Sequence, residues 1–187
     1  MANVDAPNGF TPIRHLTGGT IRANEYPMLT SYSTKIHSGD AVIMDTTGYI
    51  AISGATPTNL VGVFAGCSYT NAAGEKKFSK YWDGVTTHTS AIAYVYDDPK
   101  IVYAVQHDGT GALADNNATF DLTVTAGTDS TGRSNFELST SSKATDAPVR
   151  QIGLVNKPSN AWGASAEVEV IFEDHVWNGT AGAADAS

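Results

Sequence analysis

Short runs of β-branched and aromatic residues, separated by turn-forming residues roughly every 8–15 positions, are the feature that most constrains this fold. No window of a dozen residues repeats its apolar side chains at the 3.6-residue period of a helix. Val, Ile, Tyr and Phe suit the pleated, half-buried surface of a sheet. The sequence therefore predicts an all-β fold with little helix, built as a small β-barrel or sandwich with long loops.

The strands are predicted from these runs and from the turns between them. The turn at 45–48 separates two short strands, and the turn at 71–76 closes a hairpin over 68–82. Residues 91–96 and 101–106, on either side of Asp97-Asp98-Pro99, are predicted to be the strongest strand pair, with a hairpin at 94–105. Further strands are expected at 60–65, 122–124, 149–155 and 167–172. Residues 126–146 are interpreted as a long loop, and 110–118 as one helical turn at most.

The first 30 residues form a segment of their own kind. Pro7, Pro12 and Pro27, together with several glycines, interrupt every possible helix. The same segment carries apolar residues that a disordered tail would lack. We expect an extended arm over 1–30 that either wraps its own domain or reaches a neighbour. A barrel or sandwich domain is expected over 31–178, with a small β lobe around 68–110 as a further division, and a disordered tail over 179–187.

The overall charge limits which partners the chain is expected to bind. The net charge is −8, with 11 Lys and Arg residues scattered along the chain, so the clustered basic face of a nucleic-acid-binding protein is not expected. No stretch approaches the roughly 18 apolar residues of a membrane helix, and no signal peptide is recognised at the N-terminus. Cys67 is the single cysteine, which excludes a disulfide within the chain. We expect a protein made in a cytoplasm, or assembled into a particle there, that binds neither nucleic acid nor membrane.

Catalytic and metal-binding patterns are not recognised. The five histidines do not form a compact metal-ligand spacing with Cys, Asp or Glu. There is no Gly-x-Ser-x-Gly nucleophile motif, and Cys67 follows a buried strand, where a small core residue is the better interpretation. The Asp-rich segments at 45–48, 97–98 and 108–111 are typical of turns. We therefore expect no enzyme activity, no cofactor and no metal site.

Several segments resemble a known family. Ser38-Gly39-Asp40-Ala41-Val42, Gly48-Tyr49-Ile50 and Val61-Gly62-Val63-Phe64 resemble the β-barrel core of the capsid cement, or head decoration, proteins of tailed bacteriophages. Longer phage structural proteins encoded beside major capsid proteins are similar at further segments: 9–16, Ser79-Lys80-Tyr81-Trp82, 96–99, Thr131-Gly132-Arg133-Ser134, 137–138 and 152–155. The resemblance implies a virion protein on the outer surface of an icosahedral capsid. It would bind the major capsid protein and itself, as a homotrimer.

This reading assigns residues to two surfaces. In the arm, Phe10, Ile13 and Leu16 are predicted to be apolar anchors on the capsid, and Arg14 and Arg22 to pair with acidic groups or carbonyls there. The second surface is the interface between subunits, where unpaired strand edges would be covered. Its candidate residues are Tyr94, Tyr96 and Tyr103.

A binding module is the alternative. The aromatic residues Trp82, Trp162 and Trp177, with Tyr81 and Tyr96, could form a sugar platform, although core and interface positions are commoner for such residues. In that case the chain would be a receptor- or carbohydrate-binding β module of a phage tail or fibre.

Overall fold

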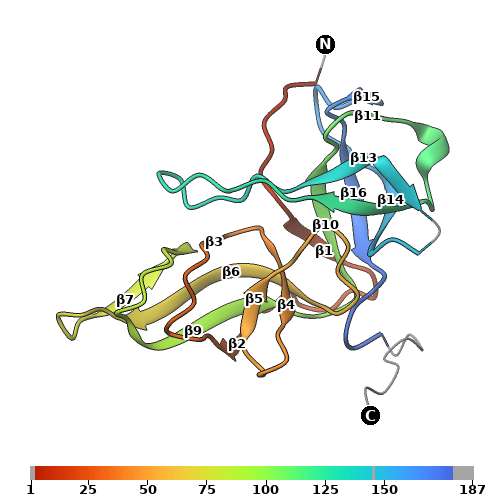
Figure 1. Cartoon of the computed structure of the whole chain (residues 1–187). Helices are drawn as coiled ribbons and strands as arrows, with labels where there is room; N and C mark the ends of the chain where they lie inside the picture. The colour runs from red at the N-terminus through yellow and green to blue at the C-terminus, as the bar shows by residue number, and fades with distance from the viewer. Residues whose placement is uncertain (1–2, 145, 179–187) are drawn as a thin grey trace.

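The computed structural model describes residues 3–144 and 146–178 and confirms the all-β fold (Figure 1). Two six-stranded sheets, in which every strand pair is antiparallel, make up most of it. Within the described residues, the single helical element is the 3₁₀ turn η1 (Leu113–Asp115), which agrees with the prediction of one turn at most. The predicted tail 179–187 lies outside the described residues.

The first sheet, sheet I, has the strand order β1-β10-β16-β14-β12-β13. Its strands are β1 (Thr11–His15), β10 (Ile101–Gln106), β12 (Thr119–Thr123), β13 (Glu137–Ala144), β14 (Val149–Leu154) and β16 (Glu167–Phe172). The second sheet, sheet II, has the order β2-β9-β6-β4-β5, and β7 pairs with the far end of β6. Its strands are β2 (Asn24–Pro27), β4 (Ala41–Met44), β5 (Ile50–Ile52), β6 (Leu60–Thr70), β7 (Lys76–Ser79) and β9 (Thr89–Tyr96).

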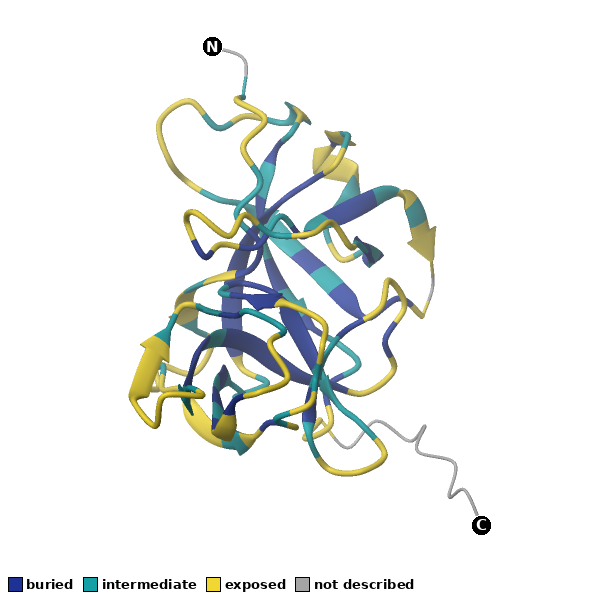
Figure 2. Ribbon diagram, turned by 60° about the vertical axis from the view of Figure 1, so that its left-hand side comes forward, coloured by how far each residue is buried: buried dark blue, intermediate teal, exposed yellow. Residues whose placement is uncertain are grey.

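Two short strand pairs complete the fold. Strand β3 (Ile36–His37) pairs with β8 (Tyr81–Trp82) beside sheet II, and β11 (Thr110–Gly111) pairs with β15 (Gly163–Ala164) at the end of sheet I. Figure 2 shows that buried residues follow the central strands and that exposed residues gather in the outlying loops and turns.

Side-chain alternation along sheet II gives the molecule two cores. In β6, Leu60 and Val63 face sheet I, whereas Val61 and Phe64 face the opposite side. The register of β6 against β4 shifts between Leu60 and Gly62, and this bulge interrupts the period-two alternation of the strand. The first core lies between the two sheets and includes Phe10, Tyr103 and Phe172. The second lies beneath sheet II, where Trp82 and Ile36 from the β3–β8 pair cover it. The described residues form a sandwich of two open sheets, and they do not form a closed barrel.

The predicted hairpin at 94–105 is wrong. Strand β9 pairs with β2 and β6 in sheet II, whereas β10 pairs with β1 and β16 in sheet I. The segment Asp97-Asp98-Pro99 is therefore a crossover between the sheets. Both strands read as strong strands because both lie in cores, and burial alone carries no information about which strands pair.

The predicted long loop at 126–146 is also wrong in its second half, because residues 137–144 form β13 at the edge of sheet I. Only one side of an edge strand needs apolar residues, so its Ser, Thr and Lys content hid it. By contrast, the β4–β5 and β6–β7 hairpins form at the predicted turns. Asp45 Oδ1 accepts bonds from the backbone N–H groups of Thr47 and Tyr49 at 2.8 and 2.9 Å, which is the local bonding that favours Asp in turns.

Candidate protein-binding surface

The N-terminal segment wraps its own domain, which was the first of the two predicted possibilities. It supplies an edge strand to each sheet, β1 to sheet I and β2 to sheet II. The segment therefore contains regular strands, whereas the sequence predicted an extended arm. Phe10, predicted to be a capsid anchor, is 1% exposed. Its ring makes edge contacts with Tyr103 and Phe172 at centroid distances of 6.2 and 5.2 Å. Phe10 is thus a core residue and is not available to a partner.

The other four predicted arm residues lie on the surface. Ile13 and Leu16 are 39% and 43% exposed, and Arg14 and Arg22 are exposed as well. Ile13 falls where the register of β1 against β10 shifts, so it is the bulged residue of an edge strand. Arg14 already binds Glu169 of the same chain, with Nε 3.1 Å from Oε2. Pairing of Arg14 with a partner would therefore have to displace this contact or share Glu169.

His15 fixes the loop that carries Leu16 and Arg22. Its Nδ1 accepts hydrogen bonds from the backbone N–H groups of Thr17 and Gly19, at 3.2 and 3.1 Å. The proton is therefore on Nε2, which donates to Asp98 at 3.0 Å. The loop is thereby held against the crossover between the sheets.

The three tyrosines predicted at an oligomer interface separate into two groups. Tyr103 is 1% exposed, and its hydroxyl donates to the carbonyl of Tyr96 at 3.0 Å, so it is a core residue. Burial also raises the pKa of Tyr103 well above its usual value. Tyr94 and Tyr96 are half-buried on the face of sheet II that points toward sheet I. Tyr94 and Tyr96 are therefore accessible to a partner, whereas Tyr103 is not.

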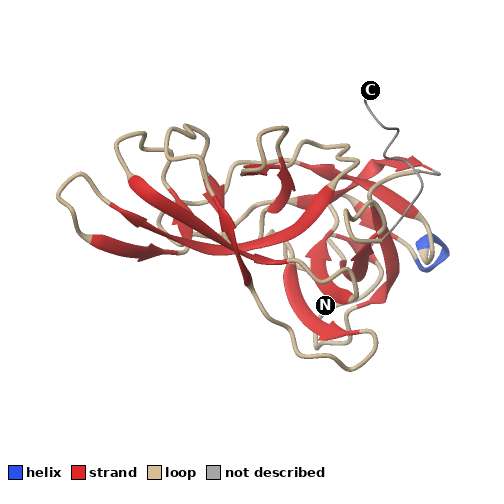
Figure 3. Ribbon diagram, turned by 90° about the horizontal axis from the view of Figure 1, so that it is seen from below, coloured by secondary structure: helices blue, strands red, loops and turns tan. Residues whose placement is uncertain are grey.

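That face of sheet II is covered only along its inner half. Figure 3 shows the strands of sheet II extending beyond the part of the molecule that sheet I occupies. Three residues form a row across neighbouring strands in the outer half. Ile92 of β9 lies opposite Ser68 of β6, and Ser68 lies opposite Phe78 of β7. Tyr94 joins this row through a bond from its hydroxyl to Ser68 Oγ at 3.2 Å. Phe78 is 72% exposed, so an apolar row continues from the core onto open surface. We call Phe78, Ile92 and Tyr94 the outer face.

Lys76 borders the outer face, on the side of β7 that carries Phe78. Lys76 Nζ lies 5.5 Å from the centre of the Phe78 ring, a cation–π contact at the surface. Lys77, on the opposite side of β7, pairs with Glu75 at 2.8 Å. In the described residues, β7 pairs with β6 alone, so its other edge offers unpaired backbone groups. An exposed aromatic residue, positive charge and a free edge together suit the binding of another protein.

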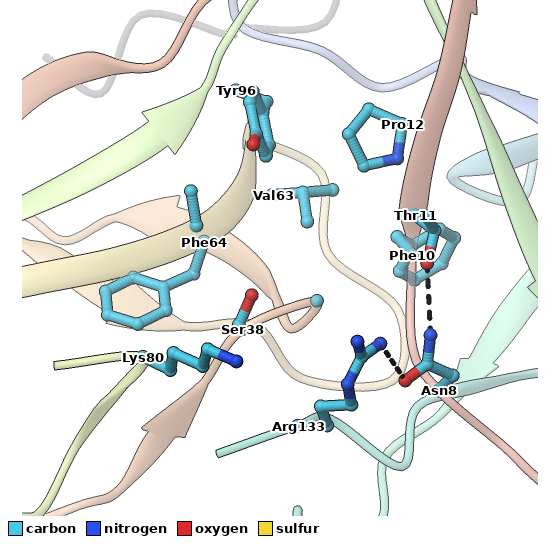
Figure 4. Close-up of a pocket in the computed structure, with 12 residues that line it drawn as sticks. Asn8, Phe10, Thr11, Pro12, Ser38, Val63, Phe64, Lys80, Tyr96 and Arg133 are labelled. Carbon is cyan, nitrogen blue, oxygen red and sulfur yellow. Dashed lines mark hydrogen bonds between the residues drawn. The ribbon is translucent and has the colours of Figure 1, made fainter. Parts of the chain in front are cut away.

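A cleft of about 310 Å³ opens at the inner end of this surface, at the junction of the two sheets (Figure 4). Phe10, Pro12, Val63 and Tyr96 form its apolar wall. Its polar lining residues are Asn8, Thr11, Ser38, Lys80 and Arg133, and Arg133 donates to Asn8 Oδ1 at 2.7 Å.

Close backbone approaches bring these groups together. Gly132 has a φ of +69°, and a Cβ there would lie 2.8 Å from the Cβ of Lys80. Gly9 has a φ of +63°, and a Cβ there would lie 2.4 Å from the Cβ of Ser134. Only glycine fits either position without strain. The segments 79–82 and 131–134, two of those that carry the family resemblance, therefore meet at the cleft.

The loop that carries Arg133 is tied to the β3–β8 pair by a buried histidine, His37 of β3. His37 Nε2 lies 3.0 Å from Asp129 Oδ1, and the His37 ring stacks on Tyr81 at 5.3 Å. Asp40 accepts from the backbone N–H of His37 at 2.7 Å, and burial raises the pKa of its carboxyl group. The backbone of Ser38 also bonds to Gly132 and Ser134. Sequence reasoning missed this site because its parts come from distant segments, with Asn8 and Arg133 125 residues apart, although both cations stand in segments marked by the resemblance.

Cys67 and His107 are both buried in the structure. Cys67 is buried, as expected of a core residue, and burial raises the pKa of its thiol to about 12, which leaves it a poor nucleophile. His107, which precedes the segment 108–111 predicted to be a turn, is fully buried, and its Nε2 bonds to Gln151 Oε1 at 2.8 Å. Within residues 3–144 and 146–178, no three His, Cys, Asp or Glu side chains are grouped to hold a metal ion.

The tryptophans do not gather on one face. Trp82 is fully buried in the second core, Trp162 packs against the first core, and Trp177 is 62% exposed. The platform considered from sequence is therefore not formed by these three residues.

Comparison with known protein families, with curated proteins and with solved structures finds no match to this chain. In the part of the chain that the structure describes, no helix is long and apolar enough to span a membrane.

Proposed function

We propose that this chain is a structural virion protein that binds the outer surface of an icosahedral phage head and cements neighbouring major capsid protein subunits. The observation that carries the binding role is the outer face, where Phe78 is 72% exposed beside Lys76 and the half-buried Ile92 and Tyr94 continue toward the core. The family resemblance of the sequence supplies the identity of the partner.

Two surfaces take part in this proposal. The first includes Ile13 in the edge strand β1 of sheet I and Leu16 and Arg22 in the segment between β1 and β2, and Phe10 supports it from within the core. The outer face forms the second, and Tyr94 is its candidate contact between subunits of a homotrimer. Stability on the particle would then come from assembly, since binding of the folded state adds to its free energy of unfolding.

Undecorated heads test the proposal directly. The purified protein should co-sediment with them to a saturating copy number and raise the temperature at which they release DNA. The variant Ile13→Ser/Leu16→Ser should weaken binding by about tenfold or more, because two exposed apolar anchors are lost. Deleting residues 2–20 would not serve, since it removes Phe10 and β1. Failure of the wild-type protein to bind heads would refute the proposal.

Size measurement tests the trimer separately. Light scattering at capsid-like concentration, with heads present and absent, should give a trimer in at least one condition. A monomer in both would refute this part alone. The alternative, a carbohydrate-binding module, would rest on the exposed Trp177 beside Tyr26, and glycan-array binding that Trp177→Ala abolishes would favour it.

A further inference from the structure

Two cations at the cleft lack the partners that the rest of this acidic chain would supply. Among residues 3–144 and 146–178, neither Lys80 nor Arg133 forms an ion pair, although the chain has 19 carboxylates and a net charge of −8. Both line the same cleft, and Figure 4 shows them on the same side of it, opposite Pro12 and Tyr96. The fold thus brings two exposed like charges to one cleft, Lys80 from the segment between β7 and β8 and Arg133 from the segment between β12 and β13. An anion placed between them would be attracted by both.

We propose that this cleft receives a short acidic segment of a partner protein, with an Asp or Glu carboxylate between Lys80 and Arg133. One N–H group of the Arg133 guanidinium donates to the neutral amide oxygen of Asn8. This bond orients the guanidinium and leaves its other donors free to bind a carboxylate. The cleft volume of about 310 Å³ is at the lower end for ligand pockets, which suits a few residues of an extended chain.

The apolar wall adds a second requirement. Pro12, Val63 and Tyr96 form the side of the cleft away from the two cations, and Tyr96 leads into the outer face along β9. An apolar residue next to the carboxylate in the bound segment would lie against this wall. The inference rests on the proposed function only for the source of the segment, a capsid protein, and its chemistry stands without it.

Labelled peptides provide the test. The probe is acetyl-Glu-Asp-Phe-Glu-Asp-amide with a fluorescent label, followed by anisotropy at 50 and 300 mM NaCl, with a Lys-Lys-Phe-Lys-Lys peptide as the control. We expect the acidic peptide alone to bind, and binding to weaken several-fold at the higher salt concentration. Lys80→Glu and Arg133→Glu should each reduce the affinity about tenfold or more. Lys100→Glu, an exposed cation away from the cleft, is the matched control.

The outcomes separate this inference from the proposed function. Equal binding of both peptides, no binding of the acidic peptide, or an affinity unchanged by Lys80→Glu and Arg133→Glu would overturn the inference. Tighter binding of a single-stranded oligonucleotide at the same residues, or self-association that the peptide does not displace, would also overturn it. Heads that bind Lys80→Glu as tightly as the wild type would contradict the inference and leave the cement function intact. Peptide binding without head binding would do the reverse. Unchanged thermal unfolding of each variant confirms that folding is not the cause.

Discussion

The inner and outer halves of sheet II are built from the same two strands, β6 and β9, yet they have different surroundings. In the inner half, Val63 and Tyr96 face a second sheet and the buried ring of Phe10. In the outer half, the same face of the same strands presents Ile92 and leads to Phe78, which is 72% exposed. The chain covers one half with its own residues and leaves the other open. Apolar residues in the inner half therefore stabilise the fold, whereas those in the outer half are available for binding.

The largest expected effect lies in the inner half. Phe10→Ala should reduce the free energy of unfolding by about 3–5 kcal/mol, because it leaves a cavity among Tyr103 and Phe172 at the sheet junction. Ile13→Ala, three residues along the same chain segment, should cost about 0.5 kcal/mol or less, because Ile13 is 39% exposed. Urea denaturation of both variants measures the difference. Similar losses for the two would show that Phe10 is not a core residue in solution.

The fate of Phe10 also shows what sequence can and cannot provide. Local signals were sufficient where the structure is local. The turn at Asp45 and the hairpin over 68–82 were predicted because the bonds that make them lie within a few residues. The class of fold followed from the same short runs.

Long-range arrangement was not accessible in this way. Strands β9 and β10 have the composition of a hairpin, but each pairs with strands distant in sequence, and nothing near Asp97 distinguishes a turn from a crossover. The same limit applies to exposure. Phe10, Ile13 and Leu16 are equivalent as apolar residues in a Pro- and Gly-rich segment, and only the position of sheet I decides which of them is buried. The cleft needs both kinds of information, since Lys80 and Arg133 lie in segments that follow strands of different sheets, β7 and β12.

An intermediate effect is expected from pH at the inner junction. His175 is buried beside Leu60, and burial lowers its pKa, while the charges of Asp97 and Asp98 and backbone groups of Val61 and Asp97 oppose that shift. The folded state then binds the proton more weakly than the unfolded state does. Stability is complete above the unfolded pKa of about 6.5 and is lost as pH falls below it, by at most about 1.4 kcal/mol per pH unit for one group.

His175→Asn tests this dependence. The Asn Oδ1 can accept the bond that Nδ1 now accepts from the backbone N–H of Trp177 at 3.1 Å, and the side chain does not titrate. Urea denaturation between pH 5 and 7.5 should give a shallower slope for the variant than for the wild type. A slope remains because burial also lowers the pKa of His107. Identical slopes would mean that His175 is charged in the folded protein or is not buried.

The smallest effect on stability is expected in the outer half, and it is the most informative about function. Phe78→Ser removes a ring that is 72% exposed and whose described contact with charge is Lys76 at the surface, so the free energy of unfolding should change by about 0.5 kcal/mol or less. Under the proposed function the same variant should lose affinity for heads, or lose self-association, by about tenfold, since exposed aromatic residues are frequent hot spots. Thr89→Ser, an exposed substitution nearby on β9, is the control. A loss of stability without a loss of binding would mean that the outer face stabilises the fold and does not bind a partner. The inner and outer halves of sheet II would then not have the separate roles that their burial indicates.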